Sequence, residues 1–160
     1  DPNPVMFFEH KALYRSIDED ILDEYYTIPF GKARLVKEGN QVTIVTYGLG
    51  VHWALELLNA HPEISADLID LRTLAPLDTQ AIYDSVKKTG RAFVLHEDTL
   101  TGGIGGEISA WISEHCFNYL DAPVIRCASL DTPIPFNMEL EQNFLAKSRL
   151  DQCVKKLVAF

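Results

Sequence analysis

Residues 91–111, RAFVLHEDTLTGGIGGEISAW, combine titratable side chains with a glycine-rich turn. An apolar run ends at His96, Glu97 and Asp98, the glycines follow, and helical spacing then begins. Imidazole and carboxylate groups can act as general acids and bases. A strand, a glycine turn and a helix N-terminus together can bind an anion through backbone amides. The stretch therefore suggests two kinds of site, an acid–base pair and a phosphate-binding turn.

The glycine turn lacks a phosphate-binding pattern, since it contains neither GxGxxG nor GK[ST]. Three acidic residues also lie in or near the turn: Glu97, Asp98 and Glu107. Their negative charges interact with the positive end of the helix and would repel a phosphate. We expect Thr101 to cap the helix and the glycines to permit close contact between backbone segments. The glycines are Gly102, Gly103, Gly105 and Gly106.

The His-Glu pair is also unsuited to act as a dyad. His96 and Glu97 are adjacent in a predicted strand, so their side chains point to opposite faces of the sheet. Arg72 at the end of a neighbouring strand extends the set to a candidate strand-end network of Arg72, His96 and Glu97. We interpret it as structural hydrogen bonding, with general acid–base chemistry as the alternative. The sequence contains no GxSxG, HExxH or CxxC motif.

The composition is that of a globular domain with its own core, with 47% apolar and 23% charged residues in a chain of 160. The formal net charge of -9 argues against nucleic acid and anionic membranes as main partners, because both require a basic surface. No apolar run is long enough to span a membrane, and no signal peptide is apparent, so we expect a protein that is not secreted. The chain opens on Asp1-Pro2-Asn3-Pro4, which we interpret as a start within a longer protein.

The cysteines are Cys116, Cys127 and Cys153. Their number is odd and no pair has metal-ligand spacing. Cys116 and Cys153 fall on apolar faces of predicted helices, and Cys127 falls in a predicted strand. We expect three reduced core residues in a cytosol-like compartment.

Three segments are predicted along the chain. Residues 1–15 contain an extended apolar run, PVMFF at 4–8, which we interpret as a strand at the tail of a preceding domain. Residues 16–31 are acidic and lack clean periodicity, which favours a linker. Residues 32–160 form the compact domain.

Strand and helix patterns alternate through the compact domain. Residues 32–37 and 42–48 are strand patterns, and the connection between them contains Gly-Asn, which predicts a hairpin and hence an antiparallel edge strand. Asp78 should cap one helix and Gly90 should end it. This alternation predicts an α/β/α sandwich with about five strands, mostly parallel. In such sheets ligands bind beyond the carboxyl ends of the strands.

Several motifs in order resemble one family. They are NPVMFFEHKALYR, VTIVTYG, DLRTLAPLD, TGRAFVLHED, LTGGIGGEIS and DAPVIRCASLDTPIPF. Together they resemble the C-terminal half of the β subunit of thiamine-diphosphate-dependent 2-oxo acid dehydrogenases, which implies the transketolase C-terminal domain fold. The segments HED, LTGG and DTPIPF resemble the branched-chain members, the 2-oxoisovalerate dehydrogenases, more than the pyruvate members.

The resemblance implies oxidative decarboxylation of a branched-chain 2-oxo acid, with transfer of the acyl group to lipoyl-lysine. In such enzymes thiamine diphosphate and magnesium lie between the α subunit and the N-terminal domain of a β subunit. It therefore implies no catalytic and no cofactor-binding residue in this chain, which we expect to be inactive alone. The implied partners are the α subunit, a second β subunit and the acyltransferase core, in bacterial cytoplasm or in the mitochondrial matrix.

A few site residues follow from the resemblance alone. The family's D-x-N-P turn contributes ligands to a structural potassium ion, which implies Asp1 and Asn3 as metal ligands here. Phe160 is implied to lie near the docking surface for the acyltransferase, and the glycines at 102–106 are implied to lie at a subunit interface.

Other classes of protein stay open. The chain resembles the pyruvate dehydrogenase β subunit and the C-terminal domain of transketolase-like or deoxyxylulose-phosphate-synthase-like enzymes less well. A sugar-phosphate enzyme should show extra basic residues at the strand ends, where acidic residues dominate here. An independent nucleotide-binding module would need a phosphate-binding motif.

Overall fold

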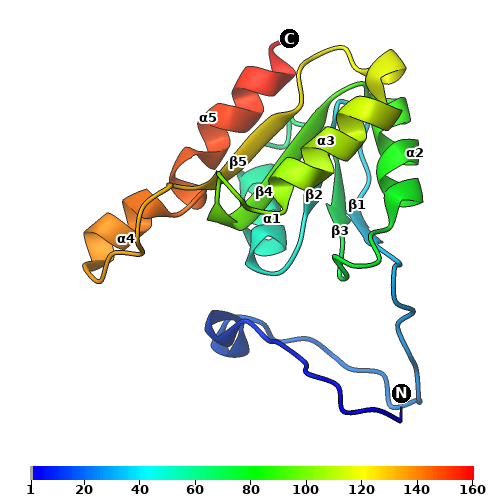
Figure 1. The fold of residues 1–160 in the computed structure, drawn as a ribbon, viewed down its shortest axis with the longest axis vertical. Helices are drawn as coiled ribbons and strands as arrows, with labels where there is room; N and C mark the ends of the chain where they lie inside the picture. The colour runs from blue at the N-terminus through cyan, green and yellow to red at the C-terminus, as the bar shows by residue number, and fades with distance from the viewer. Residues whose placement is uncertain (1) are drawn as a thin grey trace.

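A computed structural model describes residues 2–160 and shows one five-stranded sheet with helices on both faces (Figure 1). The strands are β1 (Arg34–Lys37), β2 (Val42–Thr46), β3 (Ala66–Asp70), β4 (Ala92–Thr99) and β5 (Ile125–Ser129). The α-helices are α1 (Leu49–Ala60), α2 (Thr79–Thr89), α3 (Gly105–His115), α4 (Met138–Phe144) and α5 (Lys147–Val158). Two short 3₁₀ helices are η1 (Lys11–Arg15) and η2 (Phe117–Tyr119). The predicted α/β/α sandwich is confirmed.

The sheet has the order β1-β3-β2-β4-β5, and only β1 runs antiparallel to its neighbour. The antiparallel edge strand is therefore confirmed, but the predicted hairpin is wrong, because β1 pairs with β3 and not with β2. Strands β3 and β4 pair in parallel with the two edges of β2, so neither edge is free for β1. The Gly-Asn turn lies beside β3, where the Gly39 amide donates to the Asp67 carboxylate at 2.8 Å. A Cβ at Gly39 would collide with the backbone of Ser65 and Ala66.

Apolar side chains fill the sheet on both sides. Helices α1 and α5 pack on one face, where Trp53, Leu57 and Leu58 of α1 are buried. Helices α2 and α3 pack on the other face, where Ile108 and Ile112 of α3 are buried. Both faces of β2 are covered, which is why all of its residues are buried.

Two helix ends show how well local capping was predicted. Asp78 caps α2, accepting a hydrogen bond from the Ala81 amide at 3.2 Å, and Gly90 ends the helix with φ 71°. The expectation that Thr101 caps α3 is wrong. Helix α3 begins later, after Ile104, and has no side-chain cap. The Thr101 hydroxyl instead donates to Asp131 at 2.7 Å.

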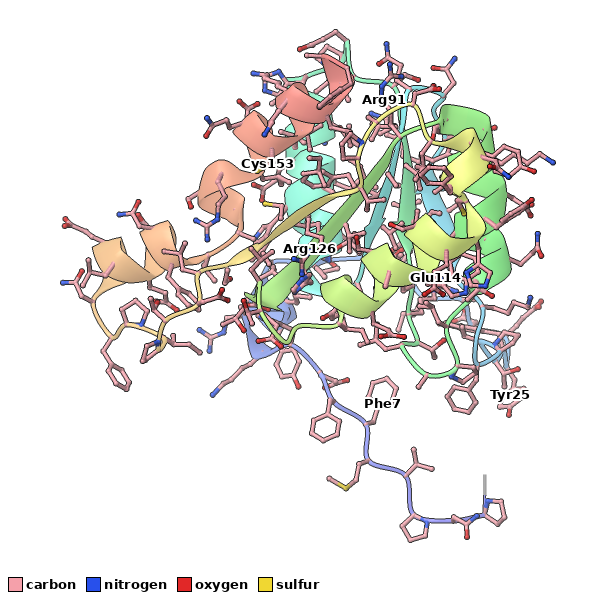
Figure 2. All side chains as sticks on the ribbon, turned by 45° about the horizontal axis from the view of Figure 1, so that its top comes forward. Phe7, Tyr25, Arg91, Glu114, Arg126 and Cys153 are labelled. Carbon is pink, nitrogen blue, oxygen red and sulfur yellow. The ribbon has the colours of Figure 1, made fainter. Side chains whose placement is uncertain are left out.

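The N-terminal segment, residues 2–30, lies outside the sandwich and contains no strand (Figure 1). The strand predicted at residues 4–8 is not formed, because no described strand lies beside them to accept their backbone hydrogen bonds. Their large side chains are exposed, and Figure 2 shows Phe7 on the segment that extends away from the domain. The division of the chain at residues 15 and 31 stays a prediction.

The cysteines match their prediction in part. All three are free thiols, and Cys116 and Cys127 lie in the core, but Cys153 is only half-buried at its margin. Within residues 2–160 no helix is long and apolar enough to cross a membrane.

Candidate functional site at the carboxyl edge of the sheet

The direction of the chain connections reverses between the carboxyl ends of β2 and β4. The chain leaves β2 for α1 on one face, and it leaves the adjacent β4 for α3 on the other. This reversal is the point at which doubly wound sheets bind ligands. Tyr47 follows β2 here, and Glu97 and Asp98 lie near the end of β4.

A side chain from the N-terminal segment lies at this edge. The Nε2 of His10 is 3.0 Å from an Oε2 of Glu97, across 87 positions of sequence. Side chains of η1 and the residues after it also enclose a cavity of about 500 Å³ against β1 and α1. Its lining includes Leu13, Ile17, Arg34, Gly48, His52 and Asp70. The segment preceding the domain thus covers part of the edge that a ligand would approach.

Tyr47 places a phenol at this edge of the sheet, directly after β2. Burial raises its pKa, and the carboxylates of Asp98 and Glu97 raise it further. Since both carboxylates oppose a phenolate, Tyr47 stays protonated at neutral pH and can donate a hydrogen bond. Sequence reasoning did not select this phenol, although its place directly after a buried strand was a usable signal.

His96 fills a closed space beneath the start of α3. It is fully buried, and a Cβ at Gly103 or Gly105 would collide with its ring. Neither ring nitrogen has a hydrogen-bond partner. Burial is the main cause that lowers its pKa; Arg126 lowers it further, and Asp98 opposes them. The ring is therefore neutral and enclosed by the start of α3, where no ligand can reach it.

The structure does not join the candidate network of Arg72, His96 and Glu97. The His96 ring has no polar partner, and Glu97 is bound to His10. Arg72 is exposed with φ 57°, and its amide donates to Asp70 at 3.2 Å. The network was expected because the ends of β3 and β4 share one edge of the sheet, but β2 lies between these two strands, and the pleat directs His96 toward α3 and away from Glu97.

A diphosphate does not fit the glycine turn. The amide and hydroxyl of Thr101 already donate to the Asp131 carboxylate, at 2.8 and 2.7 Å. The Thr101 amide is the main cause that lowers the pKa of Asp131, and its hydroxyl is the second. The donors that a phosphate would need are therefore already bound to the Asp131 carboxylate. The ring of His96 fills the space at Gly103 and Gly105. Sequence reasoning missed the Thr101–Asp131 pair, because no local pattern connects positions 30 residues apart.

The residues that the resemblance assigned to metal binding and docking lie near the two ends of the chain. Asp1 lies outside the described residues, and Asn3 lies in the exposed N-terminal segment. Within residues 2–160, no group of three or more His, Cys, Asp or Glu side chains is placed to hold a metal ion. The potassium ligands therefore stay a prediction. Phe160 is 60% exposed beyond the end of α5. Its docking role and the interface role of the glycines also stay predictions.

Comparisons with known proteins agree with this geometry. The family model for the transketolase C-terminal domain matches residues 31–149. The 2-oxoisovalerate dehydrogenase subunit β of Bacillus subtilis (strain 168) is 41% identical over 164 aligned residues, which cover 100% of this chain and 50% of that protein. The pyruvate dehydrogenase E1 component subunit β of Rickettsia bellii (strain RML369-C) is 44% identical over 144 residues, covering 89% of this chain and 44% of that protein.

A solved structure shows the same fold. It is a split-gene transketolase in an inactive β4 tetramer, with a TM-score of 0.67 and 23% identity, and the match covers 88% of this chain and 46% of that one. Fold and family model together define an α/β/α domain of the transketolase C-terminal type, and the chain belongs to that family. In sequence it is similar to the β subunits of 2-oxoisovalerate dehydrogenase. It spans about half the length of the curated relatives it matches.

Proposed function

We propose that this chain is the C-terminal domain of the β subunit of a branched-chain 2-oxo acid dehydrogenase. The whole enzyme would use thiamine diphosphate and magnesium to decarboxylate branched 2-oxo acids oxidatively, and would pass the acyl group to lipoyl-lysine. The observation that supports this most is the 41% identity that extends over the whole chain.

The chain's own contribution would be assembly and docking. Its strand-end edge is partly covered by its own residues, and its glycine turn holds a carboxylate in place of a phosphate. Large apolar side chains are exposed on the N-terminal segment and before and within α4, where a subunit could cover them. They include Phe7, Phe8, Tyr25, Ile134, Phe136 and Met138. The proposed partners are the α subunit, a second β subunit and, through the end of α5, the acyltransferase core.

Cofactor binding tests the proposed division of labour. Calorimetric titration of this chain with thiamine diphosphate and magnesium should give no heat of binding. The whole β subunit assembled with its α subunit should bind both under the same conditions. Saturable micromolar binding to the chain alone would contradict the assignment of the cofactor site to other domains.

Substrate selection tests the branched-chain assignment. The assembled enzyme should decarboxylate 2-oxoisovalerate with a kcat/KM that exceeds that for pyruvate by about tenfold or more. The opposite preference would favour the second candidate, a pyruvate dehydrogenase β subunit, which the 44% identity to the Rickettsia bellii protein supports. Activity with sugar phosphates in place of both acids would favour a transketolase-like enzyme.

A nucleotide-binding module is the rival of another class. It would be supported by saturable binding of ATP to this chain. The proposed compartment, bacterial cytoplasm or mitochondrial matrix, agrees with three unpaired cysteines.

A further inference from the structure

Two thiols meet where α5 packs on β5. Cys127 lies in β5 and is 2% exposed, and the half-buried Cys153 of α5 packs against the core cluster that contains it. Figure 2 shows Cys153 on α5, beside the sheet. Both residues line one cavity of about 220 Å³, together with Arg126 and Arg149. The sulfurs therefore share a cavity that a small reagent can enter.

The two thiols have different environments. Burial is the main cause that raises the pKa of Cys127 to about 12; the charge of the neighbouring Cys153 and a hydrogen bond with it act in the same direction, and Arg149 opposes them. The Cys127 thiol lies 3.5 Å from the Ala146 carbonyl oxygen, to which it donates. Cys127 is thus held as a thiol, whereas Cys153 is the partner that reaches solvent. An oxidant arriving through the cavity meets Cys153 first.

We propose that Cys127 and Cys153 form an oxidation site at which hydrogen peroxide converts the two thiols into one disulfide. The Cys153 thiolate attacks peroxide, an S–O bond forms, the O–O bond breaks and hydroxide leaves. The Cys127 sulfur then attacks the sulfenic acid; an S–S bond forms, the S–O bond breaks, and the oxygen leaves as water with the Cys127 proton. Two thiols and one peroxide yield one disulfide and two waters.

The disulfide would fasten α5 to β5. It would close a loop of about 25 residues, which constrains the unfolded chain and should raise the thermal midpoint. Arg149 of α5 already joins the two elements, because its guanidinium donates twice to the Ala128 carbonyl of β5, at 3.2 and 3.1 Å. The site belongs to this domain and does not depend on the parent enzyme's substrate.

Peroxide treatment of the reduced wild-type chain tests the site directly. Free thiols are then alkylated under denaturing conditions, and the digested peptides are analysed by mass spectrometry. We expect two of the three thiols to be lost, one peptide pair to be linked through Cys127 and Cys153, and Cys116 to be alkylated. We also expect the thermal midpoint to rise, and added thiol to reverse both changes. Retention of all three thiols, or linkage only between separate chains, would overturn the proposal.

Matched variants separate the two cysteines from the third. Cys116→Ala should still form the disulfide, because Cys116 lies at the end of α3 on the other face of the sheet. Cys127→Ala should stop at a sulfenic acid on Cys153, which dimedone captures. An equal yield of dimedone adduct on Cys153 in the wild type and in Cys127→Ala would show that Cys127 does not resolve the sulfenic acid and would overturn the pairing. The wild-type experiment decides the matter even where a variant fails to fold.

Discussion

At the scale of single residues, the space around His96 explains the composition of the LTGGIGGEI segment. A buried imidazole occupies the volume into which side chains at Gly103 and Gly105 would project. The two glycines therefore permit a close approach between β4 and the start of α3. Gly106, one position further on, faces only the end of the Arg126 side chain, which a Cβ at that position would meet at 3.4 Å.

Gly105→Ala should therefore destabilise the domain by about 1–3 kcal/mol, because the His96 ring is enclosed and cannot move aside. Gly106→Ala is the matched control in the same helix. Its new methyl group meets a flexible guanidinium, and alanine should stabilise the helix by about 0.5–1 kcal/mol. Urea unfolding of both variants measures the difference, and equal effects would show that the His96 ring does not fill the space.

His96 should also make stability depend on pH. Burial holds its pKa below the ordinary value in the folded chain, so the unfolded chain takes up a proton first as the pH falls. The contribution of His96 to the free energy of unfolding is therefore constant above the unfolded pKa of about 6.5 and is lost progressively as the pH falls below it. Arg126 acts in the same direction and Asp98 against it. Thermal midpoints between pH 7.5 and 5 should fall less for His96→Phe than for the wild type; identical slopes would contradict this.

At the scale of elements, the side chains that cap α2 and α4 differ in what else they bind. Asp78 accepts from Ala81 at the start of α2 and also from the Ala33 amide at 3.0 Å, which fixes the entry to β1. Asn137 caps α4 by accepting from two amides of the same helix. Asp78 is 7% exposed, whereas Asn137 is exposed. One cap joins two elements, and the other serves a single helix.

Asp78→Ala should cost about 2 kcal/mol, because it removes a cap and leaves a second amide without its acceptor. Asn137→Ala should cost about 1 kcal/mol or less, since the amides that it frees can bind water. Chemical unfolding of the two variants, side by side, measures both values. A larger loss for Asn137→Ala would show that the Ala33 contact contributes nothing.

At the scale of the whole molecule, the N-terminal segment and the sandwich meet through a sparse set of contacts. The His10–Glu97 pair is one of them, and both side chains are about one-third exposed, at 31% and 39%. Such a pair contributes roughly 0–1 kcal/mol, so it can position the segment but cannot govern the stability of the domain. The sandwich should therefore remain stable when the segment is released.

His10→Ala should speed tryptic cleavage after Lys11 and Arg15, because the segment loses its contact with β4. The unfolding midpoint of the sandwich should change little. Tyr14→Phe is the control, since it removes a hydrogen bond from the Tyr14 hydroxyl to Glu9 within the segment and leaves the contact with Glu97 intact. Unchanged cleavage in His10→Ala would mean that the pair does not hold the segment in solution.

Local patterns were sufficient for most of the elements. The strands at 42–46, 66–70 and 92–99 are short runs rich in apolar residues, and the apolar spacing of α1, α3 and α5 matches one buried face. The Asp78 cap and the Gly90 end were predictable because each depends on backbone geometry within a few residues. The Thr101 cap failed because Asp131, which is remote in sequence, competes for the same hydroxyl.

By itself, the sequence determined the fold class, the family resemblance and the burial of Cys116 and Cys127, because periodicity and motifs act over short distances along the chain. Tertiary structure alone decided that β1 pairs with β3, that His96 lies beneath two glycines, that His10 binds Glu97 and that Cys127 meets Cys153. Each of these contacts joins residues distant in sequence. The packing of helices on the sheet selects them, and no local propensity encodes that choice.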